Sequence, residues 1–307
     1  MLRIVISIYI CGILRIKRNF MSDGENREEV TSKKRRKKDP QAEMSFLDHL
    51  EELRWHIIRS ALAVVLFSVI AFVLKGFIFD TIILKPMAPE FWTNRMLAKL
   101  AELVGSESLK INQQPLHLIA IKMADQFMIH IMTSIIAGMI MSSPVIFYEF
   151  WRFIKPALYD KEKKHASGAV FYTSILFMLG VLFGYFLIVP LSIQFLGTYS
   201  ISEQITNQIN TRSYIGIVTS ISLASGVVFL LPIFSYFLSK VGILTPSFMK
   251  TYRRHAYVVM LLLSAIITPP DVFSQIMVCV PLIFLYEIGI MISKKVVKKR
   301  EKEFNEM

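Results

Sequence analysis

The sequence predicts an all-α polytopic membrane protein with six transmembrane helices. Of its 307 residues, 54% are hydrophobic, and the mean hydropathy is +0.50. The apolar residues come in blocks of about twenty, which is the length of helix that crosses a bilayer. The net charge is +12, and its Lys and Arg residues gather at the ends of these blocks. Basic residues in such places are typical of topology signals and of contacts with anionic lipids, and no nucleic-acid partner is expected.

Residues 1–43 are expected to form an extension that precedes the membrane domain. The apolar run within residues 1–20 is only about eleven residues long, which is too short to span a bilayer. Two interpretations stay open for it: a start codon assigned too early, with Met21 as the true beginning, or an interfacial anchor helix. Residues 22–43 are rich in charge and include the run KKRRKK at positions 33–38. Their composition predicts a disordered cytoplasmic segment.

The first two spans are predicted at residues 55–74 and 123–147. The second span is expected to extend as helix through Phe153. In the long connection between the two spans, apolar residues of the stretch 91–104 recur at helical spacing with charged residues between them. We expect this stretch to form a helix on the outer membrane face that ends at Gly105.

Prolines shape the third and fourth spans. The third span is predicted at residues 166–189 and is expected to stop at Pro190. The fourth span, at residues 214–238, contains Pro232. Because proline lacks a backbone N–H and its ring clashes with the preceding turn, Pro232 predicts a kink or a loose turn there.

The fifth predicted span, residues 255–268, is short. About fourteen residues give roughly 21 Å of helix, whereas the hydrocarbon core of a bilayer is about 30 Å thick. We therefore expect local thinning of the membrane near this helix, or shielding by its neighbours. The turn TPPD at 268–271 separates it from the sixth span, residues 272–293, which is followed by a basic tail, residues 294–307.

The orientation follows from the Lys and Arg residues of the short connections. The segments rich in Lys and Arg are assigned to one side of the membrane: residues 33–38, the loops after the second and fourth spans, and the basic tail. The opposite short connections contain Arg212 alone or no basic residue. Both termini are therefore predicted to be cytoplasmic. The resulting organisation is an extension (1–43), a six-span domain (44–293) and a cytoplasmic tail (294–307).

The sequence contains no recognisable catalytic or metal-binding motif. Its six histidines are dispersed and none belongs to an H-E-x-x-H pattern. Cys11 and Cys279 lack the spacing of a disulfide or metal site. His49 and Glu52 lie three residues apart, which could serve a metal or an ordinary hydrogen bond at a helix start. We expect neither an enzyme nor a cofactor. A small-solute or ion transporter or channel is the alternative function, although the interiors of the third to fifth spans carry no charge for such a role.

Acidic residues at the predicted cytoplasmic face are the main candidates for binding. Glu51 and Glu52 precede the first span, while Glu149 and Glu162 flank the loop after the second. Carboxylates pair with guanidinium groups, often through two parallel hydrogen bonds. These residues therefore suggest a receptor for a positively charged peptide. The alternative is pairing within the chain, with the nearby basic residues Arg54, Arg59 and Lys163.

Three motifs together resemble the TatC family, the multispanning receptor subunit of the twin-arginine protein translocase. They are HLEELR before the first span, FIKPALYDKE in the first inner loop and TPPDVFSQ at the last outer turn. The likeness covers residues 44–293 in order and includes LGVLFGYFLIVPLSIQFL and PLIFLYEIG. The resemblance implies a concave, glove-shaped bundle of six helices, of which the last two are short.

The resemblance also implies a function. Such a protein is the core receptor of a translocase in the bacterial cytoplasmic (inner) membrane, with both termini cytoplasmic. It binds the twin-arginine signal peptides of folded cargo at the cytoplasmic face, and export uses the proton-motive force. The implied partners are membrane lipids and small single-span Tat subunits of the TatA/TatB type, in a multimeric complex.

The resemblance assigns roles to particular residues. The signal-binding carboxylates of the family map onto Glu52 and Glu162. The other signal-binding positions map onto Leu53, Arg54, Phe153, Pro156 and Tyr159. The positions for assembly and transport map onto Pro86, Asp271 and Gln275. For Pro86 and Asp271, turn and cap chemistry is an alternative role.

The chain departs from the family at one place. Many relatives have Glu or Gln in the fourth span, two residues before its proline, where this chain has Leu230. The contact with partner helices that a buried polar group could make there is not available to leucine. Ser222 and Ser225, which lie one or two turns earlier, are the candidates to replace it.

Overall fold

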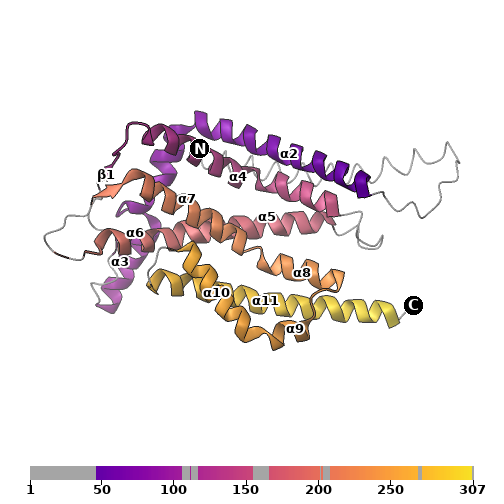
Figure 1. Cartoon of the computed structure of the whole chain (residues 1–307). Coiled ribbons are helices and arrows are strands. Elements are labelled where there is room, and N and C mark those ends of the chain that lie inside the picture. Colours follow the sequence, from indigo (N-terminus) through magenta and orange to yellow (C-terminus); the bar gives the residue numbers. More distant parts are fainter. Residues whose placement is uncertain are drawn as a thin grey trace. The chain divides into compact units, whose positions relative to one another are not determined.

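The computed structural model describes residues 46–105, 111, 117–154, 166–200, 202, 208–268 and 272–305, and this part of the chain is mainly helical (Figure 1). Five stretches are long enough and apolar enough to cross a membrane: Glu51–Val73, Asp125–Ile154, Gly168–Thr198, Thr211–Val241 and Gln275–Lys298. The prediction of a multi-pass helical membrane protein is confirmed at this level.

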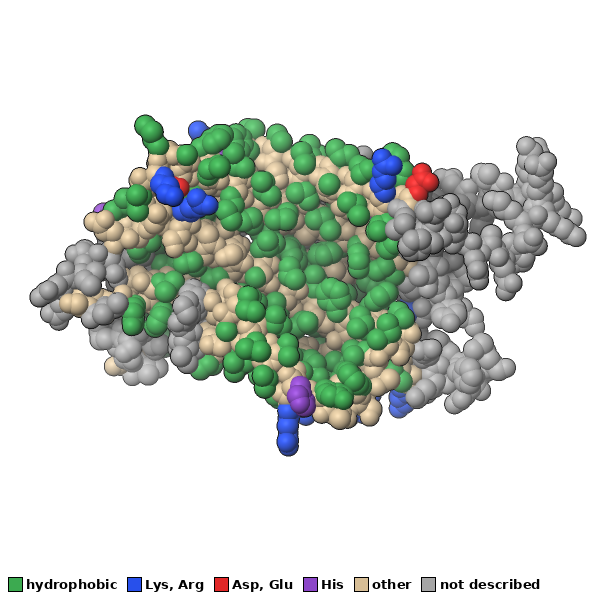
Figure 2. Space-filling model, viewed as in Figure 1, with side chains coloured by type: hydrophobic (Ala, Val, Ile, Leu, Met, Phe, Trp, Pro, Cys, Tyr) green, Lys and Arg blue, Asp and Glu red, His purple; other side chains and the backbone are tan. Residues whose placement is uncertain are grey.

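The surface and the interior have the distribution of side chains that a lipid environment favours. Large apolar side chains are exposed along the spans, and Figure 2 shows hydrophobic side chains over much of the visible surface. Small hydroxyl side chains are instead fully buried, among them Ser142, Ser174, Ser192 and Ser239. Small residues allow close packing of helices in a solvent that is itself apolar.

The chain forms two compact units. The first comprises the described residues of Met1–Ala71 and Ala137–Ile175, and the second those of Phe72–Ile136 and Leu176–Met307. In the first unit, helix α2 (Phe46–Val73) approaches helix α4 (Asp125–Ile154) closely. A Cβ atom added at Gly138 of α4 would lie 2.2 Å from Ser68 Oγ and 2.8 Å from Ser68 Cα of α2. The absence of a side chain at Gly138 therefore permits this helix contact.

The first two predicted spans are confirmed, and the first belongs to a longer helix than expected. Helix α2 begins at Phe46, so the polar residues before the predicted span form its first turns. Helix α4 continues to Ile154, as predicted. The amphipathic stretch is also confirmed, as helix α3 (Trp92–Val104), which ends at Gly105 in the left-handed conformation, with φ 69°. Glycine adopts this conformation without the steric penalty of a Cβ.

The third span does not stop at Pro190, contrary to the prediction. Helix α5 (Ala166–Phe183) continues through a π-helical turn, η7 (Gly184–Ile188), into helix α6 (Val189–Thr198). Pro190 stands in the first turn of α6, where a missing N–H is tolerated. The carbonyl that Pro190 leaves without its helical donor is that of Phe186, four residues earlier. It accepts a hydrogen bond from the hydroxyl of Thr93 in α3. This contact gives that carbonyl a donor in place of the missing N–H.

The fourth span is interrupted where the sequence predicts a kink or turn. Helix α7 (Thr211–Val228) ends two residues before helix α8 (Leu231–Val241), and Pro232 lies in the first turn of α8. Leu230 is buried in the connecting turn. Of the two serines suggested as substitutes, Ser222 donates to a carbonyl of its own helix at 2.7 Å. The hydroxyl of Ser225 is buried without a hydrogen-bond partner in the described part of the chain.

The C-terminal helices lie together in the second unit. A short helix α9 (Pro246–Thr251) precedes α10 (Arg253–Ile267) and α11 (Val272–Asn305), and α11 packs against both α8 and α10 (Figure 1). As predicted, α10 is short, with 15 residues. The expectation that the last helix is short as well is wrong for α11, which has 34 residues. Its polar end is rich in Lys and Glu, which are strong helix formers, so the helix continues beyond the apolar segment.

Further short elements connect the spans of the second unit. A π-helical turn, η2 (Phe77–Ile83), and a 3₁₀ turn, η3 (Lys85–Met87), follow α2. Strand β1 (Leu118–Ile119) pairs in parallel with strand β2 (Ile209–Asn210), with Leu118 opposite Ile209. The pairing joins the connections before α4 and before α7.

Candidate functional site

The first turns of α2 present a row of polar side chains. Glu52, His56 and Arg59 are separated by four and three residues, so they lie on one face of the helix. His56 is only 5% exposed, whereas the side chains of Glu52 and Arg59 are 40% and 47% exposed. The face therefore has a buried centre between two accessible, oppositely charged ends.

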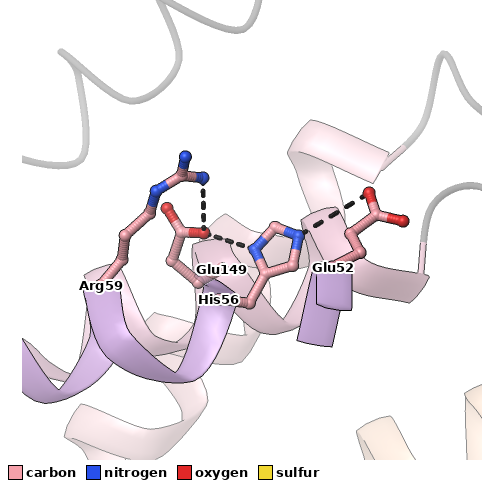
Figure 3. A network of polar contacts seen from close by, with 4 residues as sticks. All are labelled: Glu52, His56, Arg59 and Glu149. Atoms are coloured by element: carbon pink, nitrogen blue, oxygen red, sulfur yellow. Dashed lines mark hydrogen bonds and ion pairs between the residues drawn. The ribbon is translucent and has the colours of Figure 1, made fainter. Parts of the chain in front are cut away.

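Helix α4 supplies the partner of this face. Glu149, in the penultimate turn of α4, is 6% exposed, and its Oε2 lies 2.6 Å from His56 Nδ1 (Figure 3). An ionised carboxylate can only accept a hydrogen bond, so His56 Nδ1 is the donor. Arg59 Nη1 lies 3.8 Å from the same oxygen, and His56 Nε2 lies 4.0 Å from Glu52 Oε1. The imidazole of His56 thus stands between two carboxylates that belong to different helices.

Only some of the signal-binding residues predicted from the sequence are described, and they differ in how close they lie to this network. Phe153 packs against His56, with ring centroids 6.0 Å apart and an edge-on angle of 66°. Leu53 is half-buried and Arg54 is exposed. The remaining predicted residues, Pro156, Tyr159 and Glu162, lie outside the described residues.

The sequence assigned no role to His56. It placed Glu149 among the acidic candidates at the cytoplasmic face, but the family resemblance did not include Glu149 in the signal-binding set. The spacing of Glu52, His56 and Arg59 could have identified the shared helix face. Glu149 lies 93 residues away from His56. No local pattern indicates that contact, which depends on how α2 and α4 pack.

The predicted outer position Pro86 lies in a buried, hydrogen-bonded connection of the second unit. The side chain of Asn94 in α3 donates to the carbonyl oxygens of Pro86 and Ala88, at 3.1 and 2.8 Å. The hydroxyl groups of Tyr185 and Tyr214 donate to the carbonyls of the preceding η2 turn, at 2.7 and 2.8 Å. These contacts hold the backbone of the connection in which Pro86 lies.

The other predicted outer residues are Gln275 and Asp271. Gln275 Nε2 donates to the carbonyl of Leu261 at 3.3 Å and so connects α11 with α10. Asp271 lies outside the described residues. A second contact, which is charged, ties the same two helices together: Glu287 accepts hydrogen bonds from Arg253 and from the hydroxyl of Tyr257, both at 2.6 Å.

Within the described ranges, no group of three or more His, Cys, Asp and Glu side chains could hold a metal ion. The side chain of His49, which the sequence places near Glu52, lies outside them. The chemistry of the network is therefore that of carboxylates and their hydrogen-bond partners, which can bind a cation such as a guanidinium group.

Comparison with known proteins identifies the family. The model of the family "Sec-independent protein translocase protein (TatC)" matches residues 48–281. The TatC protein of Blattabacterium sp. subsp. Periplaneta americana is 41% identical over 265 residues, which cover 86% of this chain and 100% of that protein. The TatCy protein of Bacillus subtilis is 32% identical, over 85% of this chain and 92% of that protein.

Solved structures give the same result. A crystal structure of the twin-arginine translocase receptor TatC aligns with a TM-score of 0.62 at 32% identity, covering 81% of this chain and 99% of that one. A second crystal structure of a TatC receptor, in DDM, aligns with a TM-score of 0.64 at 34% identity, over 80% and 99% of the two chains. The motifs, the apolar spans and these matches agree: the chain belongs to the TatC family.

Proposed function

We propose that this chain is the core receptor subunit of a twin-arginine translocase and binds the signal peptides of folded cargo at the cytoplasmic face. Membership of the TatC family makes it a component of a Sec-independent protein translocase. The observation that carries the receptor role is the accessible carboxylate of Glu52 beside the buried His56–Glu149 pair, at the polar start of the first span. We assign no catalytic step to the chain.

The proposed topology has six spans and two cytoplasmic termini, in the inner membrane of a bacterium. Five spans correspond to the long apolar stretches, and α10 serves as the fifth span in chain order. Its 15 residues give roughly 22 Å of helix, so the bilayer must thin beside it or α11 must shield it. We further propose that the six helices form the concave, glove-shaped bundle that the family resemblance implies.

The proposed recognition step uses charge. The two guanidinium groups of a signal peptide meet Glu52 and Glu162, while Leu53, Arg54, Phe153, Pro156 and Tyr159 shape the surrounding surface. The apolar section of the signal then enters the bundle. Loss of one charge-assisted hydrogen bond costs about 1.5–3 kcal/mol, or roughly a 10- to 150-fold loss of affinity.

Assembly and transport are proposed to use other parts of the chain. Pro86, Asp271 and Gln275 support contacts with small single-span subunits of the TatA/TatB type, and the proton-motive force drives export. At the fourth span, Leu230 offers no polar group. Ser225 is the remaining candidate for that polar contact, because its hydroxyl has no hydrogen-bond partner among the described residues.

Site-specific photocrosslinking tests the receptor role. A photoreactive amino acid is introduced at position 52 or 162 of the full-length protein in membranes, and a signal peptide carrying Arg-Arg or Lys-Lys is added. We expect adducts that depend on Arg-Arg at both positions. A second measurement is the export of a folded twin-arginine reporter, which the double substitution of Glu52 and Glu162 by alanine should abolish.

The outcomes separate the receptor from its alternative. Normal export by the double variant, present in the membrane at the wild-type level, would refute the site. Uptake of a small solute by vesicles that contain this protein without partner subunits would favour the transporter or channel instead.

A further inference from the structure

We infer that Glu149 is an additional guanidinium-binding carboxylate of the signal site and that Arg59 occupies it until a signal arginine takes its place. This inference rests on the proposed function. Glu149 of α4 would bind a guanidinium group of the signal, and Arg59 of α2 would neutralise Glu149 while no signal is bound.

The burial of Glu149 is the first observation. A carboxylate that is 6% exposed requires partners that compensate its charge. In the described part of the chain, its polar contacts are those with His56 and Arg59, and both involve Oε2. The His56 contact, at 2.6 Å, is a hydrogen bond, whereas the 3.8 Å to Arg59 is too long for one. Oε1 has no donor among the described residues and can accept one.

The loose attachment of Arg59 is the second observation. A guanidinium group bound tightly to a carboxylate usually forms two parallel hydrogen bonds. In the part of the chain that the structure describes, Arg59 makes one long contact with this carboxylate, and its side chain is 47% exposed. A contact of 3.8 Å without a hydrogen bond holds Arg59 less firmly than such a two-point contact would. A guanidinium group that forms both hydrogen bonds could therefore displace Arg59 at little cost, and the positive charge beside Glu149 would be kept.

The position of His56 is the third observation. Its two ring nitrogens face Glu149 at 2.6 Å and Glu52 at 4.0 Å, so the two carboxylates flank one imidazole ring (Figure 3). Twin arginines are neighbours in their peptide, and neighbouring side chains of an extended peptide point in opposite directions. Two carboxylates on opposite edges of a ring match this arrangement: Glu52 receives one arginine, and Glu149 joins Glu162 in receiving the other. His56 is then a positioning residue that fixes Glu149 through its hydrogen bond.

The test measures the affinity of a fluorescent Arg-Arg signal peptide for the full-length protein in lipid nanodiscs, by anisotropy. The variants are Glu149→Gln, Arg59→Gln and the double substitution; Arg95→Gln, on the exposed surface of α3, is the matched control. A Lys-Lys peptide measures binding that does not depend on guanidinium groups. Glutamine at position 149 keeps an oxygen that can accept from His56, which preserves the helix contact.

We expect Glu149→Gln to weaken Arg-Arg binding by about ten- to a hundredfold. Arg59→Gln should tighten it, by roughly two- to fivefold, because the competitor is a weakly held exposed group. In the double variant, the increase in affinity caused by Arg59→Gln should disappear. Arg95→Gln should bind the Arg-Arg peptide with wild-type affinity. A merely structural role of the pair predicts weaker binding, or no change, for Arg59→Gln.

Two results would overturn the inference: wild-type affinity in Glu149→Gln, or tightening by Arg59→Gln that persists in the double variant. Failure of the proposed function is distinguishable, because the wild type would then bind both peptides equally and Glu52→Gln would have no effect. If Glu52→Gln weakens Arg-Arg binding while neither substitution at 149 or 59 changes it, only the role of this pair is refuted. A melting temperature close to wild type in each variant excludes unfolding as the cause.

Discussion

Replacement of Asn94 by leucine is expected to open the connection between the first span and α3. Asn94 is fully buried, and its amide group donates to two carbonyl oxygens of that connection. The carbonyl of Ala88 also accepts from the backbone N–H of Phe91, at 3.1 Å, and would keep that partner. The carbonyl of Pro86 would lose the donor that the described residues provide.

These contacts determine the size of the effect. A buried acceptor left without a partner costs about 1–3 kcal/mol, and the loss of a hydrogen bond whose acceptor keeps another donor costs about 0.5–1.5 kcal/mol. The free energy of local opening should therefore fall by roughly 2–4 kcal/mol, which corresponds to exchange about 30- to 700-fold faster. Leucine branches at the same carbon as asparagine and is the larger residue, so the change removes the donors without leaving a cavity.

Hydrogen exchange followed by mass spectrometry measures this opening. The amides of Ala88 and Phe91 are the probes, because both donate hydrogen bonds within the connection. Asn94→Asp, which offers only acceptors to the two carbonyls, should have an effect at least as large. Arg95→Leu, one position along and exposed, is the control. Unchanged exchange of these amides in Asn94→Leu would refute the assigned role of the side chain.

Two further predictions concern helix contacts. Gly138→Ala should destabilise the protein by about 1–3 kcal/mol, because the new methyl group overlaps the facing serine of α2. Gly168→Ala has no atom within 4 Å of its new Cβ and should leave the melting temperature unchanged or raise it; equal effects at the two sites would contradict the close approach. Thr93→Val should cost about 1–3 kcal/mol by leaving the Phe186 carbonyl without its hydroxyl donor. Adding Pro190→Ala, which restores an N–H, should recover part of that loss in thermal melting. No recovery would mean that the carbonyl has another donor.

Several features of the fold could be predicted because local chemistry decides them. Gly105 ends α3 since glycine adopts the left-handed conformation freely, and Pro232 interrupts the fourth span because its ring disrupts a helix. The same reasoning gave a wrong prediction at Pro190, where the helix continues. The π turn before it and the hydroxyl of Thr93 make it acceptable, and Thr93 is separated from its acceptor by 93 residues.

The candidate site was predictable to a similar extent. Glu52 could be identified from its place at the start of a span. The role of Glu149 could not, since it arises from the packing of α4 against α2 and from a histidine that bridges the two helices. The length of α11 was missed for another reason: hydropathy indicates where a helix leaves the lipid, whereas backbone propensity decides where it ends.

The π-helical turn Gly184–Ile188 sets the rotational phase of α6 relative to α5. A π turn closes hydrogen bonds between residues five apart and so holds about one residue more than an α turn. Each residue of an α-helix rotates the chain by about 100°. Val189 to Ile193 are all buried, so each side chain of this first turn of α6 has its neighbours at the phase that the extra residue provides. Deletion of a single residue from the turn could leave an unbroken helix, yet it would rotate each of these side chains toward the neighbours of another.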